Sequence, residues 1–232
     1  MLSLYSAYSA YSAPLASAGA SVRHATVAMQ SKEELATALN PAIGYFDPLG
    51  LADADFWSQG NEATWGFLRH AEIKHGRVAM FAFCGYIAQA NGLHWPEFFG
   101  PLTTGATPEE QWFNLSIEAR CQIIAFIGFL EFWDELNPAN KHYMRGGRPG
   151  DYPDFEQIPA QWWRNLYDPF GIAAKNSPEK KAKGLLAELN NGRLAQIGII
   201  TMVSESHLPG SVPGLTGLIK PFAGDVMAPL TM

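Results

Sequence analysis

The sequence predicts an all-α membrane protein with three transmembrane helices, of which the first and third form a crossed, pseudo-twofold pair. The main observation is a duplicated cassette: residues 72–77 read Glu-x-x-His-Gly-Arg, and residues 188–193 read Glu-x-x-Asn-Gly-Arg. Each cassette follows a turn of the form aromatic-Asp-Pro-apolar-Gly, at residues 46–50 and 167–171. Such a repeat of turn, linker and helix indicates an internal duplication. Three segments of sufficient length and an uneven distribution of Lys and Arg between their connections complete the prediction.

Residues 1–30 are expected to be a transit peptide or a disordered leader, and residues 31–232 the folded domain. The tripeptide Tyr-Ser-Ala occurs three times in succession at residues 5–13, and no acidic residue precedes Glu33. A leader that is rich in Ser and Ala and lacks acidic residues is typical of organelle targeting peptides.

Three helices are expected, at about residues 61–91, 118–136 and 177–207. A 30-residue helix is about 45 Å long, which exceeds the roughly 30 Å thickness of the hydrocarbon core of a bilayer. No run of 18 uninterrupted apolar residues occurs, so a simple hydropathy rule would miss all three segments. Ser177 followed by Pro178 marks the start of the third helix, because Ser is a favoured N-cap residue and Pro is tolerated in the first turn.

The connections between these segments differ sharply in positive charge. Residues 91–117 contain no Lys or Arg, whereas residues 135–183 contain eight of the 16 in the chain. Connections rich in Lys and Arg stay on the side from which a membrane protein is inserted. We therefore expect residues 91–117 to be translocated, with the N-terminus on the cis side and the C-terminus on the trans side.

The charged residues of the two cassettes are expected to form reciprocal ion pairs. A lone charge within a membrane is costly, so Glu72 should pair with Arg193 and Glu188 with Arg77. A glycine in each cassette, followed by an alanine, would let the two helices cross closely.

The same cassettes carry candidate ligands for a hard metal ion. A paired glutamate, Glu72 or Glu188, keeps one carboxylate oxygen free, and Mg²⁺ prefers oxygen donors. His75 and Asn191, one turn later, offer neutral donor atoms that add no further charge.

Composition excludes two other classes of protein. The net charge of −6 and the pI near 5.5, without a basic stripe, argue against nucleic-acid binding. Cys84 and Cys121 have no CxxC partner and lie in apolar stretches, so we expect free thiols and no disulfide framework.

The paired cassettes, each after its Asp-Pro turn, resemble the chlorophyll-binding light-harvesting complex superfamily over about residues 40–213. Residues 143–150, Tyr-Met-Arg-Gly-Gly-Arg-Pro-Gly, resemble the chlorophyll a/c antennas of algae, the fucoxanthin- and peridinin-type proteins. The resemblance implies a light-harvesting antenna, not an enzyme, in the thylakoid membrane of a plastid, with the N-terminus stromal and the C-terminus lumenal. It implies chlorophyll a, chlorophyll c and a carotenoid of the peridinin, fucoxanthin or diadinoxanthin type. The implied partners are a photosystem core, which receives the excitation energy, other antenna subunits and thylakoid lipids.

The resemblance also implies a set of axial ligands for chlorophyll magnesium: Glu72, His75, Gln122, Glu131, Glu188, Asn191, Glu205 and His207. Arg77 and Arg193 match the ion-pairing arginines of the family. The family usually has a glutamine 17 residues after the glutamate of the third helix, where this chain has Glu205. We expect a carboxylate there to be protonated or hydrated, so the site would be served by His207, by water, by Glu205 itself, or would be empty.

Two alternative functions are consistent with parts of the sequence. A photoprotective member of the same family would dissipate excitation energy, with Glu97, Glu109 and Glu110 as candidate pH sensors. The motif Glu72-x-x-His75 also matches the di-iron carboxylate proteins. That fold needs a second Glu-x-x-His motif, and the duplicate has Asn191 instead of a histidine.

Overall fold

Helices dominate the part of the chain that the structure describes. The computed structural model describes residues 31–93, 107–136, 140–153, 155, 168, 170–172, 175–224 and 230, within the unit Ser31–Met232. The expected leader at residues 1–30 and the loop carboxylate Glu97 lie outside the described residues.

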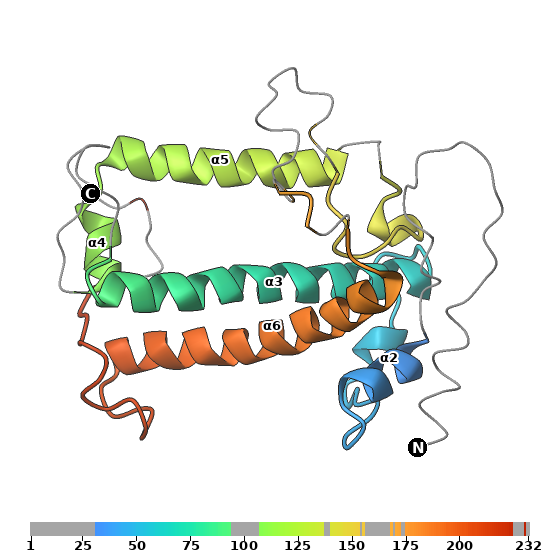
Figure 1. Ribbon diagram of the computed structural model, residues 1–232, viewed down its shortest axis with the longest axis horizontal. Coiled ribbons are helices and arrows are strands. Elements are labelled where there is room, and N and C mark those ends of the chain that lie inside the picture. Colours follow the sequence, from blue (N-terminus) through green and yellow to red (C-terminus); the bar gives the residue numbers. More distant parts are fainter. Residues whose placement is uncertain are drawn as a thin grey trace. The chain divides into compact units, whose positions relative to one another are not determined.

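Three long helices form the framework of this unit (Figure 1). They are α3 (Asn61–Ala90), α5 (Ile117–Leu136) and α6 (Pro178–His207), accompanied by the short helices α2 (Lys32–Leu39) and α4 (Pro108–Asn114) and by the 3₁₀ turns η1 (Leu51–Asp53) and η3 (Tyr143–Arg145). Each long helix differs from its expected range by one residue at one end. Among the described residues there is no strand.

Side-chain caps define where the helices begin. The Ser177 hydroxyl accepts the backbone N–H of Lys180 at the start of α6, and the Thr107 hydroxyl accepts that of Glu110 at the start of α4. Each cap satisfies one of the backbone N–H groups that a helix leaves free at its first turn. In both helices a proline follows the cap, where its missing N–H costs nothing.

The duplicated turns have the same local geometry. In each, Oδ1 of the aspartate accepts the backbone N–H four residues later, at 3.1 Å for Asp47 and 2.8 Å for Asp168. The glycine three residues later has a positive φ, 63° at Gly50 and 62° at Gly171. Backbone N–H groups, that of Ala52 contributing most, hold the pKa of Asp47 below its usual value. The sequence repeat is therefore also a structural repeat.

Helices α3 and α6 cross in backbone contact at the two cassettes (Figure 1). A Cβ added to Gly192 would lie 2.9 Å from the Cα of Gly76, and one added to Gly76 would lie 3.1 Å from the Cα of Gly192. Ala79 and Ala195 are buried one turn further along. Small residues allow this close approach, which brings the charged side chains of each helix within reach of the other.

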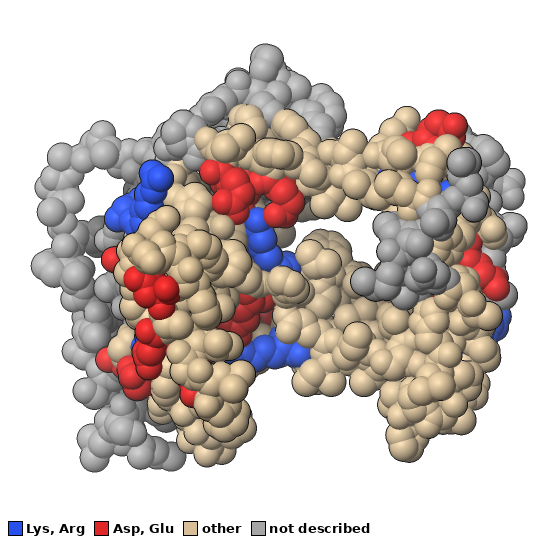
Figure 2. All heavy atoms as spheres, turned by 180° about the vertical axis from the view of Figure 1, so that it is seen from behind, with Lys and Arg blue, Asp and Glu red and all other residues tan. Residues whose placement is uncertain are grey.

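Helix α5 packs less closely than the other two long helices. Among the described residues, its backbone makes far less contact with α3 and α6 than these two make with each other. Figure 2 shows an opening between the α5 layer and the α3/α6 pair, with acidic and basic atoms meeting at one end of it. Large apolar side chains of α5 are exposed, among them Ile127, Phe129 and Phe132. Judged by length and apolar character, no single described helix qualifies as a membrane span, and α4 with α5 qualifies only as a pair bent by 107°.

Candidate functional site

Two reciprocal ion pairs lie at the crossing of α3 and α6. Arg77 Nε lies 2.5 Å from Glu188 Oε1, and Arg193 Nε lies 2.7 Å from Glu72 Oε1. Three of the four side chains are less than one-third exposed, and Arg193 is the more open one. Each helix thus supplies one acid and one base, and the four charges cancel.

A third arginine makes the two pairs unequal. Arg69 is buried on α3, one turn before Glu72, and its Nη1 contacts Glu72 Oε2. Both oxygens of Glu72 are therefore engaged. Oε2 of Glu188 has no hydrogen-bond partner among the described residues, so the expected free oxygen is present on Glu188 and not on Glu72. The i, i+3 spacing of Arg69 and Glu72 could have revealed this contact in the sequence.

His75 offers a nitrogen suited to a metal ion. Its Nδ1 lies 2.7 Å from the carbonyl oxygen of Ala71, and a carbonyl only accepts hydrogen bonds. In the neutral ring Nδ1 therefore carries the proton, which leaves the lone pair on Nε2, and the side chain is exposed. Asn191, at the equivalent place on α6, is also exposed. Asn191 and Glu188 offer the oxygen donors that magnesium prefers, and His75 offers a neutral nitrogen donor.

The two candidate ligands on α5, Gln122 and Glu131, do not belong to the crossing of α3 and α6. Both side chains are exposed. Gln122 is exposed, and Glu131 is 55 % exposed while its Oε2 accepts a hydrogen bond from Lys74 Nζ at 2.6 Å. Glu131 is thus attached to α3 through a cation that the sequence reasoning did not identify.

The end of α6 differs from the expectation for Glu205. This carboxylate is buried, and it accepts the backbone N–H groups of Gly210 at 2.8 Å and Val212 at 2.9 Å. The turn after α6 brings these donors back to the helix end, so backbone N–H groups hold the carboxylate there. His207 Nε2 is buried without a hydrogen-bond partner among the described residues, and its ring packs edge-on against Phe222.

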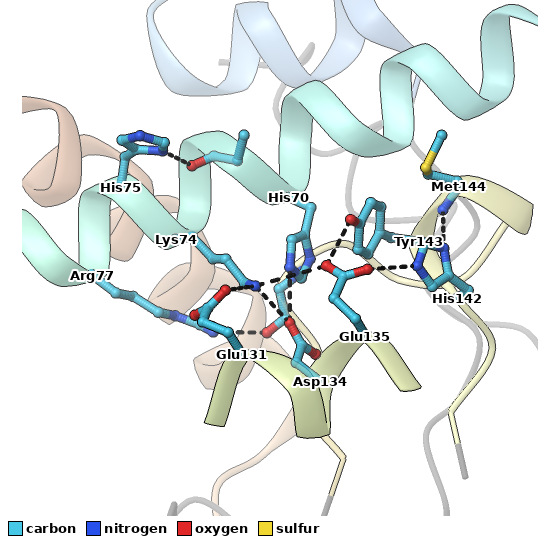
Figure 3. A network of polar contacts seen from close by, with 12 residues as sticks. His70, Lys74, His75, Arg77, Glu131, Asp134, Glu135, His142, Tyr143 and Met144 are labelled. Carbon is cyan, nitrogen blue, oxygen red and sulfur yellow. Dashed lines mark hydrogen bonds and ion pairs between the residues drawn. The ribbon is translucent and has the colours of Figure 1, made fainter. Parts of the chain in front are cut away.

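A polar network at the C-terminal end of α5 was not foreseen (Figure 3). Lys74 Nζ lies 2.6 Å from Glu131 Oε2 and 2.9 Å from Asp134 Oδ2. His70 Nε2 lies 3.1 Å from Asp134 Oδ2, and the N–H of Gly150 donates to His70 Nδ1 at 3.1 Å. Since Nδ1 accepts, Nε2 must carry the proton and donate to Asp134.

The same network fixes the turn that follows α5. The Tyr143 hydroxyl donates to Glu135 Oε1 at 2.9 Å, and the ring of Tyr143 stacks on His70 with centroids 4.0 Å apart. Burial, and after it the hydrogen bond to Glu135, raises the pKa of Tyr143, so the hydroxyl remains a donor. His142 Nε2 lies 3.0 Å from Glu135 Oε2.

This cluster is not a convincing metal site, although His70, Asp134 and Glu135 bring their ligand atoms within 4.8 Å of one another. The ammonium group of Lys74 already lies among the carboxylates. Both nitrogens of His70 are also engaged in hydrogen bonds, which leaves no lone pair for a metal ion.

Comparisons with known proteins are consistent with one another. The model of the family described as chlorophyll A-B binding protein matches residues 31–207. Fucoxanthin-chlorophyll a-c binding protein F of Phaeodactylum tricornutum is 34% identical over 172 residues, which cover 72% of this chain and 76% of that protein. The fucoxanthin-chlorophyll a-c binding protein of Trieres chinensis is 32% identical over 208 residues, covering 82% and 86%. Protein D of the same type from Macrocystis pyrifera is 31% identical over 190 residues, covering 78% and 90%. None of these matches points to a di-iron oxidase or to an energy-dissipating protein.

Proposed function

Because this chain belongs to the chlorophyll A-B binding protein family, we propose that its three long helices cross a thylakoid membrane and carry pigments at the residues described above. The protein is a chloroplast light-harvesting antenna that binds chlorophyll a, chlorophyll c and a carotenoid of the fucoxanthin type. The family is one of pigment-binding proteins, not of enzymes.

The crossing of α3 and α6 is the observation that carries the assignment of ligands. His75 Nε2 and the free oxygen of Glu188 are neutral or charge-compensated donors, and Asn191 adds an amide oxygen. These donors would hold the magnesium of chlorophyll without leaving an uncompensated charge. Bound chlorophyll supplies light absorption and excitation transfer, while the protein supplies ligands, spacing and orientation.

The proposed ligands differ in how the protein holds them. At Glu72 the carboxylate is shared between Arg69 and Arg193, so a magnesium ion there would compete with Arg69 for Oε2. Glu131 would ligate through the oxygen that Lys74 leaves free. Gln122 and His207 are kept as further candidates, whereas the hydrogen bonds to Glu205 favour a structural role for that residue.

The membrane arrangement follows from length, exposure and charge. The exposed apolar side chains of α3, α5 and α6 suit contact with lipid and pigment, and include Phe81, Phe132 and Ile197. The five basic residues between α5 and α6, together with Lys180, Lys181 and Lys183 at the start of α6, favour a stromal position for that connection. The N-terminus is then stromal, the C-terminus lumenal, and the antenna would pass energy to a photosystem core and neighbouring antenna subunits.

Reconstitution with purified pigments tests the assignment. The full chain is refolded with chlorophyll a, chlorophyll c and fucoxanthin, and the bound pigments are counted after extraction. We expect His75→Leu to lose one chlorophyll per protein. Gln89→Leu, which alters another exposed polar side chain of α3, should retain the full number. Equal pigment content in the two variants would contradict the role of His75.

A further inference from the structure

We propose that Lys74 is a positioning residue, whose ammonium group holds Glu131, and with it the C-terminal end of α5, beside α3. The inference rests on the proposed function only where it takes Glu131 as a chlorophyll ligand.

Polar side chains at its C-terminal end connect α5 to α3. Backbone packing joins α3 to α6, but no comparable packing joins α5 to α3 in the described part of the chain. Instead, Lys74 contacts Glu131 at 2.6 Å and Asp134 at 2.9 Å, and His70 contacts Asp134 at 3.1 Å. Beside the opening in Figure 2, these contacts hold the C-terminal end of α5 next to α3.

Lys74 is suited to this role by its charge and its donors. Glu131, Asp134 and Glu135 lie on adjacent turns of one helix face, where like charges repel. The ammonium group has three N–H donors, and Glu135 Oε1 lies 4.0 Å from it, beyond the two closer carboxylates. Its side chain is only 16% exposed, whereas that of Glu131 is 55% exposed. Lys74 is therefore the fixed partner and Glu131 the one that it orients.

The partners of Lys74 are themselves held in place, as Figure 3 shows. Asp134 is bonded to His70, and His70 receives the N–H of Gly150. The carbonyl oxygen of the same Gly150 accepts a hydrogen bond from Arg77 Nη1 at 2.8 Å, and Arg77 pairs with Glu188. A continuous set of polar contacts thus links the carboxylate of Glu131 on α5 to the ion pair of Arg77 and Glu188 at the crossing.

Three of the four candidate ligand carboxylates then follow one rule, and Glu205 is the exception. Glu72 is compensated by Arg193, Glu188 by Arg77, and Glu131 by Lys74, and every one of these cations lies on a different helix from its acid. Because Oε2 of Glu131 accepts a hydrogen bond from Lys74, Oε1 is the oxygen that would be left to hold a magnesium ion. Loss of Lys74 would leave the carboxylate without its cation and free to rotate away from the ligating position.

Pigment counting separates this role from a general structural one. The full chain is reconstituted with chlorophyll a, chlorophyll c and fucoxanthin as wild type, Lys74→Met, Lys74→Arg, Glu131→Leu and the double variant Lys74→Met/Glu131→Leu. The matched control is Lys183→Met, an exposed lysine of α6. We expect Lys74→Met and Glu131→Leu each to lose one chlorophyll, the double variant to lose no more than one, and Lys74→Arg to retain it.

A second measurement reports the position of α5 directly. Cys84 on α3 and Cys121 on α5 are both exposed, so each accepts a spin label in the same reconstituted proteins. The distance distribution between the labels should broaden in Lys74→Met and match wild type in Lys74→Arg and Lys183→Met.

The outcomes distinguish the inference from the proposed function. If Lys74→Met keeps the chlorophyll that Glu131→Leu loses, Lys74 does not position the ligand. If Glu131→Leu loses none, or Lys74→Met and Lys74→Arg both lose every pigment, the inference also fails. In each case pigment binding by the wild type would still support the antenna function, and only a wild type without chlorophyll would overturn it.

Discussion

Substituting Arg77 by leucine removes three interactions at the crossing of α3 and α6. Its Nε pairs with Glu188 at 2.5 Å, its Nη1 donates to the carbonyl of Gly150 at 2.8 Å, and its guanidinium group lies 5.1 Å from the ring centroid of Tyr152. Leucine keeps much of the apolar volume but leaves the Glu188 carboxylate without its cation.

The expected loss of folding stability depends on how exposed the ion pair of Arg77 and Glu188 is. Removing one partner of a buried ion pair costs about 3–5 kcal/mol, because the remaining charge is left without compensation. Arg77 and Glu188 retain about a third and a quarter of their exposure, so we expect the lower end of that range, about 3 kcal/mol. That corresponds to a change of roughly a hundredfold in the unfolding equilibrium, at 1.4 kcal/mol for each factor of ten.

The assay compares Arg77→Leu with Arg148→Leu in reconstituted protein. Arg148 is exposed and lies in the connection after α5, so its loss should be nearly neutral. Circular dichroism measured during thermal unfolding, together with pigment yield, gives the stability and the loading of each variant. Arg77→Leu should unfold at a lower temperature and bind less chlorophyll. Equal stability and equal pigment yield in the two variants would refute the argument that the ion pair holds the crossing together.

Three further predictions concern other parts of the unit. Gly192→Ala places a Cβ 2.9 Å from the Cα of Gly76 and should lower the stability by about 1–3 kcal/mol. Gly128→Ala on α5, which has open space around it, should leave the stability unchanged. Equal melting temperatures of the two variants would contradict the close crossing. Glu205→Gln should weaken the turn after α6 by about 1–2 kcal/mol without loss of a chlorophyll, since an amide oxygen accepts fewer hydrogen bonds; a lost chlorophyll in pigment extracts would show that Glu205 is a ligand. Protease added to the stromal face of sealed thylakoids should cut between Lys141 and Lys183 and spare residues 91–117. The reverse fragment pattern on gels would invert the topology.

The duplicated cassettes allowed the crossing of α3 and α6 to be predicted from the sequence. Repetition of the same Glu and Arg on two segments indicated that each acid would find its base on the other helix. Gly76 and Gly192 indicated that the backbones would meet there. Within each cassette the residues have a fixed helical spacing, so their shared helix face can be read directly from the sequence.

The sequence could not predict contacts in the same way where they depend on the path of the chain between helices. Lys74 meets Glu131 and Asp134 only because the connection from α3 to α5 returns α5 to that end of α3. Glu205 is stabilised by N–H groups of the turn that follows it, whose direction the sequence does not specify. In contrast, Arg69 lies three residues from Glu72 on one helix, a spacing that predicts contact.

Pigment analysis of the purified protein shows whether it carries the pigments of an antenna. The protein is isolated from the membrane or reconstituted, its pigments are extracted and separated by chromatography, and its metal content is measured. We expect chlorophyll a, chlorophyll c and a fucoxanthin-type carotenoid, with magnesium present in proportion to chlorophyll. A folded protein that contains no chlorophyll, or that contains iron without a tetrapyrrole, would contradict it.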